Sequence, residues 1–183
     1  MKSLQKYFVA ILPPQEILKQ VHELKKELRE EFGVKYALKS PPHITLKMPF
    51  VLEEKKVDLL RRSVEVLMEN SPAFEVTLKA VDHFRRKVIF LQVIVPGDFT
   101  EIQKKLVAHL KREFHLPIEL SDSNYHPHMT VAFQDIKKAD FDSIYDRVKS
   151  YDYHANFLVK DLWLLQKNEG VWKPLKSMEI GKK

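Results

Sequence analysis

The chain has 183 residues, of which 44% are hydrophobic and 31% charged, so it can form one compact core and is not expected to be disordered. It contains no cysteine, which excludes disulfide bonds, thiolate metal sites and cysteine nucleophiles. The formal net charge of +6 favours polyanionic partners, although a lysine-rich surface that only keeps the protein soluble would explain the same charge.

The first apolar run, residues 7–12, is expected to be a strand that stops at Pro13-Pro14. It is too short for the core of a signal peptide. No stretch approaches the ~18 apolar residues of a membrane-spanning helix. We therefore expect a cytoplasmic protein that does not enter a membrane, and a monomer.

Helical and extended patterns alternate along the rest of the chain, and no low-complexity linker divides it. Apolar residues with three- to four-residue spacing predict helices at 15–32, 53–70, 102–114 and 140–150. Further strands are predicted at 74–81 and 88–95, and at 157–166 and 171–180 in a second hairpin. Because hairpins are mixed with helices, the pattern predicts an α+β fold rather than a doubly wound α/β fold.

One short pattern, Pro-His-apolar-Thr-apolar, occurs twice. It spans residues 42–46 and 127–131, so His43 precedes Thr45 by two positions and His128 precedes Thr130 by two. The chain has only four threonines, and two of them belong to these copies, so the pair is not a chance match. The histidines are 85 positions apart, close to half the chain, which suggests two related lobes that each present one motif.

Both motifs are expected to lie on strands, where successive side chains point to opposite faces. The polar faces would carry His43, Thr45 and Lys47 on the first strand and His126, His128 and Thr130 on the second. The inward apolar faces would carry Ile44, Leu46, Met48 and Phe50 on the first strand and Met129, Val131 and Phe133 on the second. Each strand would then bury one face and line a cleft with the other.

Two imidazoles and two hydroxyls in one cleft suit a displacement at phosphorus. Such a reaction needs a base for the attacking oxygen and an acid for the leaving oxygen, and imidazole serves in either role near neutral pH. Threonine hydroxyls can donate to non-bridging phosphate oxygens from a stiff, β-branched side chain. We therefore predict that His43 and His128 are an acid–base pair and that Thr45 and Thr130 bind phosphate; which histidine is the acid stays open.

Two alternatives belong to other classes of function. His126 and His128 could bind a metal ion in a metal-dependent hydrolase, but further ligands at suitable spacing are not evident, so no metal or other cofactor is expected. A non-catalytic module that binds RNA in the same cleft is the second alternative. Turnover of a cyclic nucleotide distinguishes this module from an enzyme.

At these residues the chain resembles the two-histidine (2H) phosphoesterase superfamily, in its 2′-5′ RNA ligase or RNA 2′,3′-cyclic phosphodiesterase branch. The two His-x-Thr motifs match the signature of that family, and residues 7–14 and 85–90 are similar to its first strand and to the approach to a central strand. The resemblance spans essentially the whole chain. It implies a single domain, residues 1–183, of two interleaved lobes whose antiparallel sheets are related by a pseudo-twofold axis around a basic central cleft, with outer helices.

The resemblance also implies a metal-independent enzyme that opens 2′,3′-cyclic phosphates or processes 2′-5′ linkages of RNA ends or small cyclic nucleotides. One departure concerns the phosphate-binding cation. Many relatives place an arginine shortly after the second motif, where this chain has Ala132-Phe133. Lys47 is our first candidate for a replacement, because it is expected on the face of His43.

Other candidates for contact with substrate carry less evidence. Lys39, Arg85 and Arg86 are basic, but each is also explained as solvated surface charge. His126 adjoins the second motif. Tyr125, beside it, would either stack on a nucleobase or pack in the core.

Overall fold

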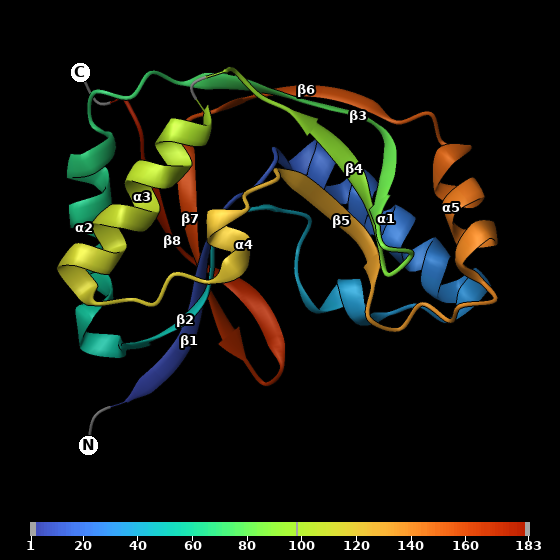
Figure 1. The fold of residues 1–183 in the computed structure, drawn as a ribbon, viewed down its shortest axis with the longest axis horizontal. Helices are drawn as coiled ribbons and strands as arrows, with labels where there is room; N and C mark the ends of the chain where they lie inside the picture. Colours follow the sequence, from blue (N-terminus) through green and yellow to red (C-terminus); the bar gives the residue numbers. More distant parts are fainter. Residues whose placement is uncertain (1–2, 98, 182–183) are drawn as a thin grey trace.

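The computed structural model describes residues 3–97 and 99–181, and two antiparallel sheets form its centre (Figure 1). The first sheet, in the order β2-β1-β7-β8, consists of β1 (Leu4–Ile11), β2 (Ile44–Glu53), β7 (Asp161–Asn168) and β8 (Val171–Glu179). The second, in the order β5-β4-β3-β6, consists of β3 (Phe74–Phe84), β4 (Val88–Ile94), β5 (His128–Phe133) and β6 (His154–Val159). The neighbouring strands of both sheets run antiparallel, which confirms the predicted α+β class.

The helices lie outside the sheets, largely where apolar spacing predicted them. They are α1 (Gln15–Phe32), α2 (Val57–Met68), α3 (Phe99–Phe114), the short α4 (Leu120–Ser123) and α5 (Phe141–Lys149), with 3₁₀ turns η1 (Tyr36–Lys39) and η2 (Glu54–Lys56). Helix α1 has the predicted bounds. It ends because Gly33 adopts a left-handed conformation, with φ of 74°, and donates its N–H to the carbonyl of Arg29.

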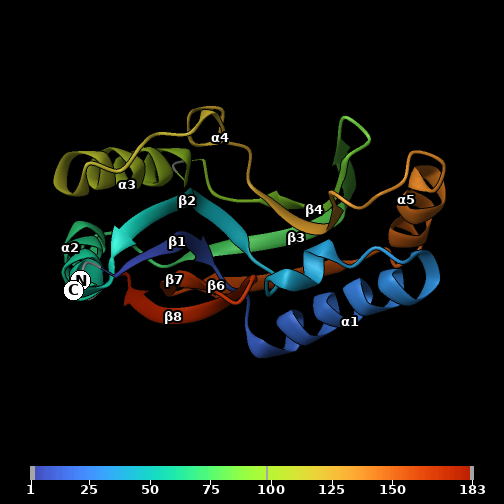
Figure 2. The same ribbon diagram turned by 90° about the horizontal axis from the view of Figure 1, so that it is seen from below.

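The order strand-helix-strand-helix occurs twice, as β1-α1-β2-α2 and, apart from the short α4 between α3 and β5, as β4-α3-β5-α5. In each copy the two strands are neighbours, and the strand of the motif, β2 or β5, forms one edge of its sheet. The copies exchange helices: α1 packs on β5 and α5, whereas α3 packs on β2 and α2. Figure 2 shows the result, with α2 and α3 at one end of the molecule and α1 and α5 at the other.

The predicted strand 157–166 is wrong, because it is two strands in different sheets. The first, β6, pairs with β3, and the second, β7, pairs with β1 and β8. Lys160 carries the chain between the sheets, and its carbonyl accepts a hydrogen bond from the N–H of Ile180. Apolar alternation indicates extended backbone but does not identify the partner strand, so the crossing has no signal in the sequence.

Strand β1 is buried on both faces, which explains its nearly continuous apolar sequence. Tyr7, Val9 and Ile11 contribute to the main core, which draws on both sheets and the long helices. Phe8 and Ala10 face the other way and form a small second cluster with Leu165. Among the described residues, no helix is long and apolar enough to cross a membrane.

Candidate active site

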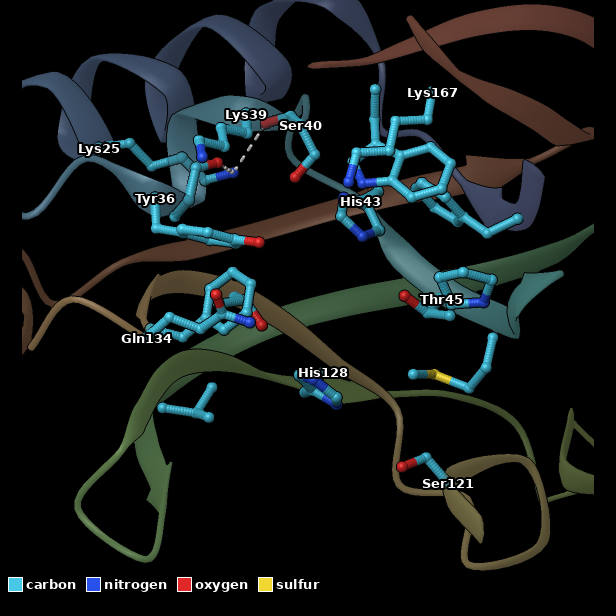
Figure 3. Close-up of a pocket in the computed structure, with 18 of the residues that line it drawn as sticks. Lys25, Tyr36, Lys39, Ser40, His43, Thr45, Ser121, His128, Gln134 and Lys167 are labelled. Atoms are coloured by element: carbon cyan, nitrogen blue, oxygen red, sulfur yellow. Dashed lines mark hydrogen bonds between the residues drawn. The ribbon is translucent and has the colours of Figure 1, made fainter. Parts of the chain in front are cut away.

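The two motifs meet across one cleft, as their duplication predicted. His43 directly precedes β2 and His128 begins β5, and these two strands contact each other. His43, Thr45, His128 and Thr130 all line a cleft of about 560 Å³. In Figure 3 the two imidazoles lie on opposite walls, with the side chain of Thr45 beside that of His43.

The two imidazoles are held in the same way. Nδ1 of His43 lies 2.7 Å from the carbonyl oxygen of Pro41, and Nδ1 of His128 lies 2.7 Å from that of His126. A carbonyl oxygen only accepts hydrogen bonds, so Nδ1 carries the proton and donates it in each ring. In the neutral tautomer this leaves Nε2 with a free lone pair for a substrate.

Aromatic packing around the imidazoles disfavours their protonation while the cleft is empty. The ring of His43 lies 4.9 Å from that of Phe8, and the ring of His128 lies 5.1 Å from Phe84 and 5.2 Å from Phe90. Burial, together with the positive charge of Lys25, lowers the pKa of His43 to about 4. Burial also lowers the pKa of His128. Both imidazoles are therefore neutral near pH 7 until an anion enters the cleft.

The prediction that Lys47 shares a face with His43 is wrong, because β2 contains bulges. Thr45 pairs with Ala10 and Lys47 pairs with Val9, so Leu46 is an extra residue that reverses the alternation of side chains. Lys47 consequently turns to the core face, where its side chain is 0% exposed and its Nζ lies 2.6 Å from Oδ2 of Asp122. It is not available as the phosphate-binding cation.

The same irregularity occurs in the second motif strand. Thr130 pairs with Phe90 and Ala132 pairs with Ile89, so Val131 is the extra residue there. Met48 and Phe133, expected on the inward faces, therefore line the cleft instead. Phe133 packs edge-on against Tyr36 of η1, with ring centroids 4.9 Å apart.

Tyr125 is hydrogen-bonded to the backbone of the first motif. Its hydroxyl donates to the carbonyl oxygen of Thr45 at 3.0 Å, and its ring lies against the core near Phe99. Burial raises the pKa of the Tyr125 hydroxyl, which stays protonated and keeps donating. Of the two predicted alternatives, core packing describes this side chain.

The remaining predicted candidates lie at different distances from the cleft. Lys39 lines it, with its ammonium 4.4 Å from the centre of the Tyr36 ring. Arg85 is exposed at the turn between β3 and β4, outside the cleft lining, and Arg86 pairs with Asp142. His126 lines a smaller adjoining cavity of about 150 Å³. Over residues 3–97 and 99–181, no group of three or more His, Asp or Glu side chains is placed to hold a metal ion.

Several residues of the cleft carry no motif that predicts them, above all Lys25 of α1. This lysine is 2% exposed and lines the cleft, and its Nζ donates to the carbonyl oxygens of Ala37 at 3.1 Å and Ser40 at 3.4 Å. Its position four residues after Val21 and three before Leu28, beside the apolar stripe of the helix, was the available signal. Tyr36 and Trp172 also line the cleft, but no motif marks them.

Sequence comparison identifies relatives that match nearly the whole chain. The sequence model of the 2′-5′ RNA ligase superfamily matches residues 13–171. A Geobacillus kaustophilus (strain HTA426) protein named "Putative phosphoesterase GK0864" is 27% identical over 185 residues, which cover 97% of this chain and 98% of that protein.

Solved structures share the fold at lower identity. The protein TT0787 of Thermus thermophilus is 18% identical, with a TM-score of 0.65 over 97% of this chain and 100% of that one. E. coli LigT in its apo form is 18% identical, with a TM-score of 0.61 over 98% and 99% of the two chains. LigT has also been solved with 3′-AMP and with phosphate. By its two His-x-Thr motifs, its paired antiparallel sheets and the match over most of its length, the chain belongs to the 2′-5′ RNA ligase superfamily.

Proposed function

We propose that this protein is a metal-independent phosphoesterase that opens 2′,3′-cyclic phosphates or processes 2′-5′ linkages of RNA ends or nucleotides, with His43 and His128 as acid and base. One observation carries the proposal: two imidazoles from separate sheets, each held through Nδ1, share one cleft with Thr45 and Thr130. Membership of the superfamily and the binding of 3′-AMP by LigT support it.

The geometry suggests a sequence of proton transfers. Nε2 of one imidazole takes a proton from water as the water oxygen bonds to phosphorus, and the other imidazolium protonates the ribose oxygen as its bond to phosphorus breaks. The Thr45 and Thr130 hydroxyls donate to the non-bridging oxygens. Because the charge of Lys25 helps to keep His43 neutral, we assign His43 as the base and His128 as the acid in this direction. The roles exchange in the reverse reaction.

The rest of the cleft suits a nucleotide. Its lining includes the aromatic side chains Phe8, Tyr36, Phe84, Phe133 and Trp172. Aromatic rings stack on any nucleobase, so such a lining favours nucleotides without strict sequence preference. The decisive experiment is turnover of the four nucleoside 2′,3′-cyclic phosphates, with the position of the product phosphate assigned. Tight binding of RNA without any turnover would overturn the enzymatic proposal in favour of the non-catalytic module.

Replacing either threonine by valine should slow the reaction by about ten- to a hundredfold. Valine keeps the shape but removes a donor to an anionic oxygen, and a hydrogen bond to a charged group is worth about 1.5–3 kcal/mol. The measurement is kcat/KM for a cyclic nucleotide in Thr45→Val and Thr130→Val. Thr77→Val on β3 is the matched control and should retain normal activity; normal activity in either motif variant would remove that threonine from the proposed site.

The pH dependence of the rate should be bell-shaped and insensitive to EDTA. Acid protonates the base and alkali deprotonates the acid, so activity falls on both sides of an optimum. Since burial lowers the pKa of both imidazoles, the alkaline limb of kcat/KM should begin on the acid side of the ordinary imidazole value, 6.5. Bound phosphate favours the imidazolium, so the alkaline limb of kcat should lie at higher pH.

The limbs report the coupled pair rather than individual histidines. The profile is measured on one cyclic nucleotide with and without excess EDTA. Loss of activity in EDTA and its rescue by a divalent ion would instead support the metal-dependent alternative with His126 and His128.

A further inference from the structure

Among the residues that the structure describes, two lysines, Lys25 and Lys47, are buried, and one of these two has a counter-charge. Lys47 pairs with Asp122, whereas no carboxylate within residues 3–97 and 99–181 lies at ion-pair distance from Lys25. An ammonium group out of water is costly unless an anion offsets its charge. Burial accordingly lowers the pKa of Lys25 to about 7. The protein surroundings of Lys25 therefore do not offset the cost of its charged form.

The position of Lys25 connects this unpaired charge to the cleft. Its Nζ donates to the carbonyl oxygens of Ala37 and Ser40, on the segment that leads to His43. Figure 3 shows its amine on the same wall of the cleft as His43, and its charge lowers the pKa of that imidazole. An ammonium has three N–H donors, and these carbonyls use two, so one remains for a ligand.

We propose that Lys25 is the phosphate-binding cation of this cleft and that an anionic phosphodiester binds together with a proton taken up by this amine. The inference rests on the proposed function for the location of the phosphate but not on turnover. Lys25 belongs to helix α1, which packs on β5. It would therefore supply the positive charge that relatives with an arginine shortly after the second motif have near Ala132-Phe133. Three other lysines, Lys6, Lys39 and Lys167, also line the cleft. Lys6 is exposed to water, and the ammonium groups of Lys39 and Lys167 lie against the rings of Tyr36 and Trp172.

We choose pH 8 for the test because of the titratable groups near Lys25. They are His22 on the same helix, Tyr36 and Lys39 on η1, His43 before β2 and His128 across the cleft. The pKa values of these three histidines are lowered, mainly by burial, so they are neutral at that pH. Lys25, with its pKa of about 7, is about nine-tenths neutral there and becomes charged when an anion raises its pKa.

The test is calorimetric binding of thymidylyl-(3′→5′)-thymidine at about pH 8 in two buffers of different ionisation enthalpy. This diester lacks the 2′-hydroxyl needed for ring closure, and its single charge does not titrate near neutral pH. Wild-type protein should take up close to one proton per bound diester. Lys25→Met should bind about ten- to a hundredfold more weakly and take up clearly less than the wild type, because only the imidazoles can then gain a proton. Uptake in Lys25→Met equal to that of the wild type would place the proton on an imidazole and overturn the proposal. Lys26→Met, the neighbouring lysine that pairs with Glu23 at the surface, is the matched control and should behave as wild type.

Two further measurements distinguish a ligand role from a structural one. Lys25→Arg keeps a permanent charge, so it should bind the diester without proton uptake. Lys25→Met should raise KM for a cyclic phosphate more than it lowers kcat. Proton uptake near zero in the wild type would overturn the proposal, and so would wild-type affinity in folded Lys25→Met. The wild-type measurement does not depend on whether Lys25→Met folds. Proton-linked binding without turnover would refute only the proposed function, whereas turnover with an unchanged KM in Lys25→Met would refute only the role of Lys25.

Discussion

Replacing His43 or His128 by alanine should each lower kcat for a nucleoside 2′,3′-cyclic phosphate by about a hundredfold or more. Loss of a general acid or base typically costs that factor, and each imidazole presents Nε2 to the shared cleft. Both side chains line the cleft and are half-buried, so both variants should unfold at nearly the wild-type temperature. The measurement is steady-state turnover together with thermal unfolding.

The chain offers a close control for this experiment. Nδ1 of His154 lies 2.8 Å from the carbonyl oxygen of Asp152, the same local hydrogen bond as in the motifs, but His154 is exposed at the start of β6 and does not line the cleft. His154→Ala should therefore leave turnover unchanged. His126→Ala should be mild as well. Near-normal turnover in either motif variant would end the acid–base assignment, and a loss in His126→Ala equal to that in His128→Ala would favour the metal-binding alternative.

Replacing Asp122 by alanine should lower the free energy of unfolding by about 3–5 kcal/mol. Removal of one partner leaves the Lys47 ammonium buried without a counter-charge, and such a loss is much larger than that of a surface pair. Asp122 also accepts hydrogen bonds from the backbone N–H groups of Met48 and Glu119, so it fixes α4 to the bulged part of β2.

Urea or thermal unfolding measures this effect, and the exposed pair of Glu101 and Lys104 on α3 serves as comparison. Glu101→Ala should change the free energy of unfolding by no more than about 0.5 kcal/mol, because water screens that pair. If Asp122→Ala lowered the free energy of unfolding by as little as Glu101→Ala, groups other than Asp122 would have to stabilise the buried Lys47 ammonium. We also expect slower turnover in Asp122→Ala, since the bulge that it stabilises directs Met48 toward the cleft.

Features that depend on local pattern could be predicted from the amino-acid sequence. Apolar spacing placed α1 to the residue, and it located α2, α3 and α5 within a few residues, because burial of one helix face repeats with the helical period. The duplicated motif identified the family and the two strands that meet at the cleft. Strand alternation placed His43, Thr45, His128 and Thr130 correctly, because these residues precede the bulges.

The direction of side chains beyond those bulges, and the residues that reach the cleft from other elements, depend on tertiary contacts. One extra residue in each motif strand reversed the faces, so Lys47 became buried and Phe133 entered the cleft. The division of the predicted strand 157–166 depended on which sheet each half joins. Lys25 reached the cleft because α1 packs against the opposite lobe. Local pattern records which way a side chain points relative to its neighbours, but pairing register and helix exchange depend on contacts between segments far apart in the chain, and no local pattern encodes them.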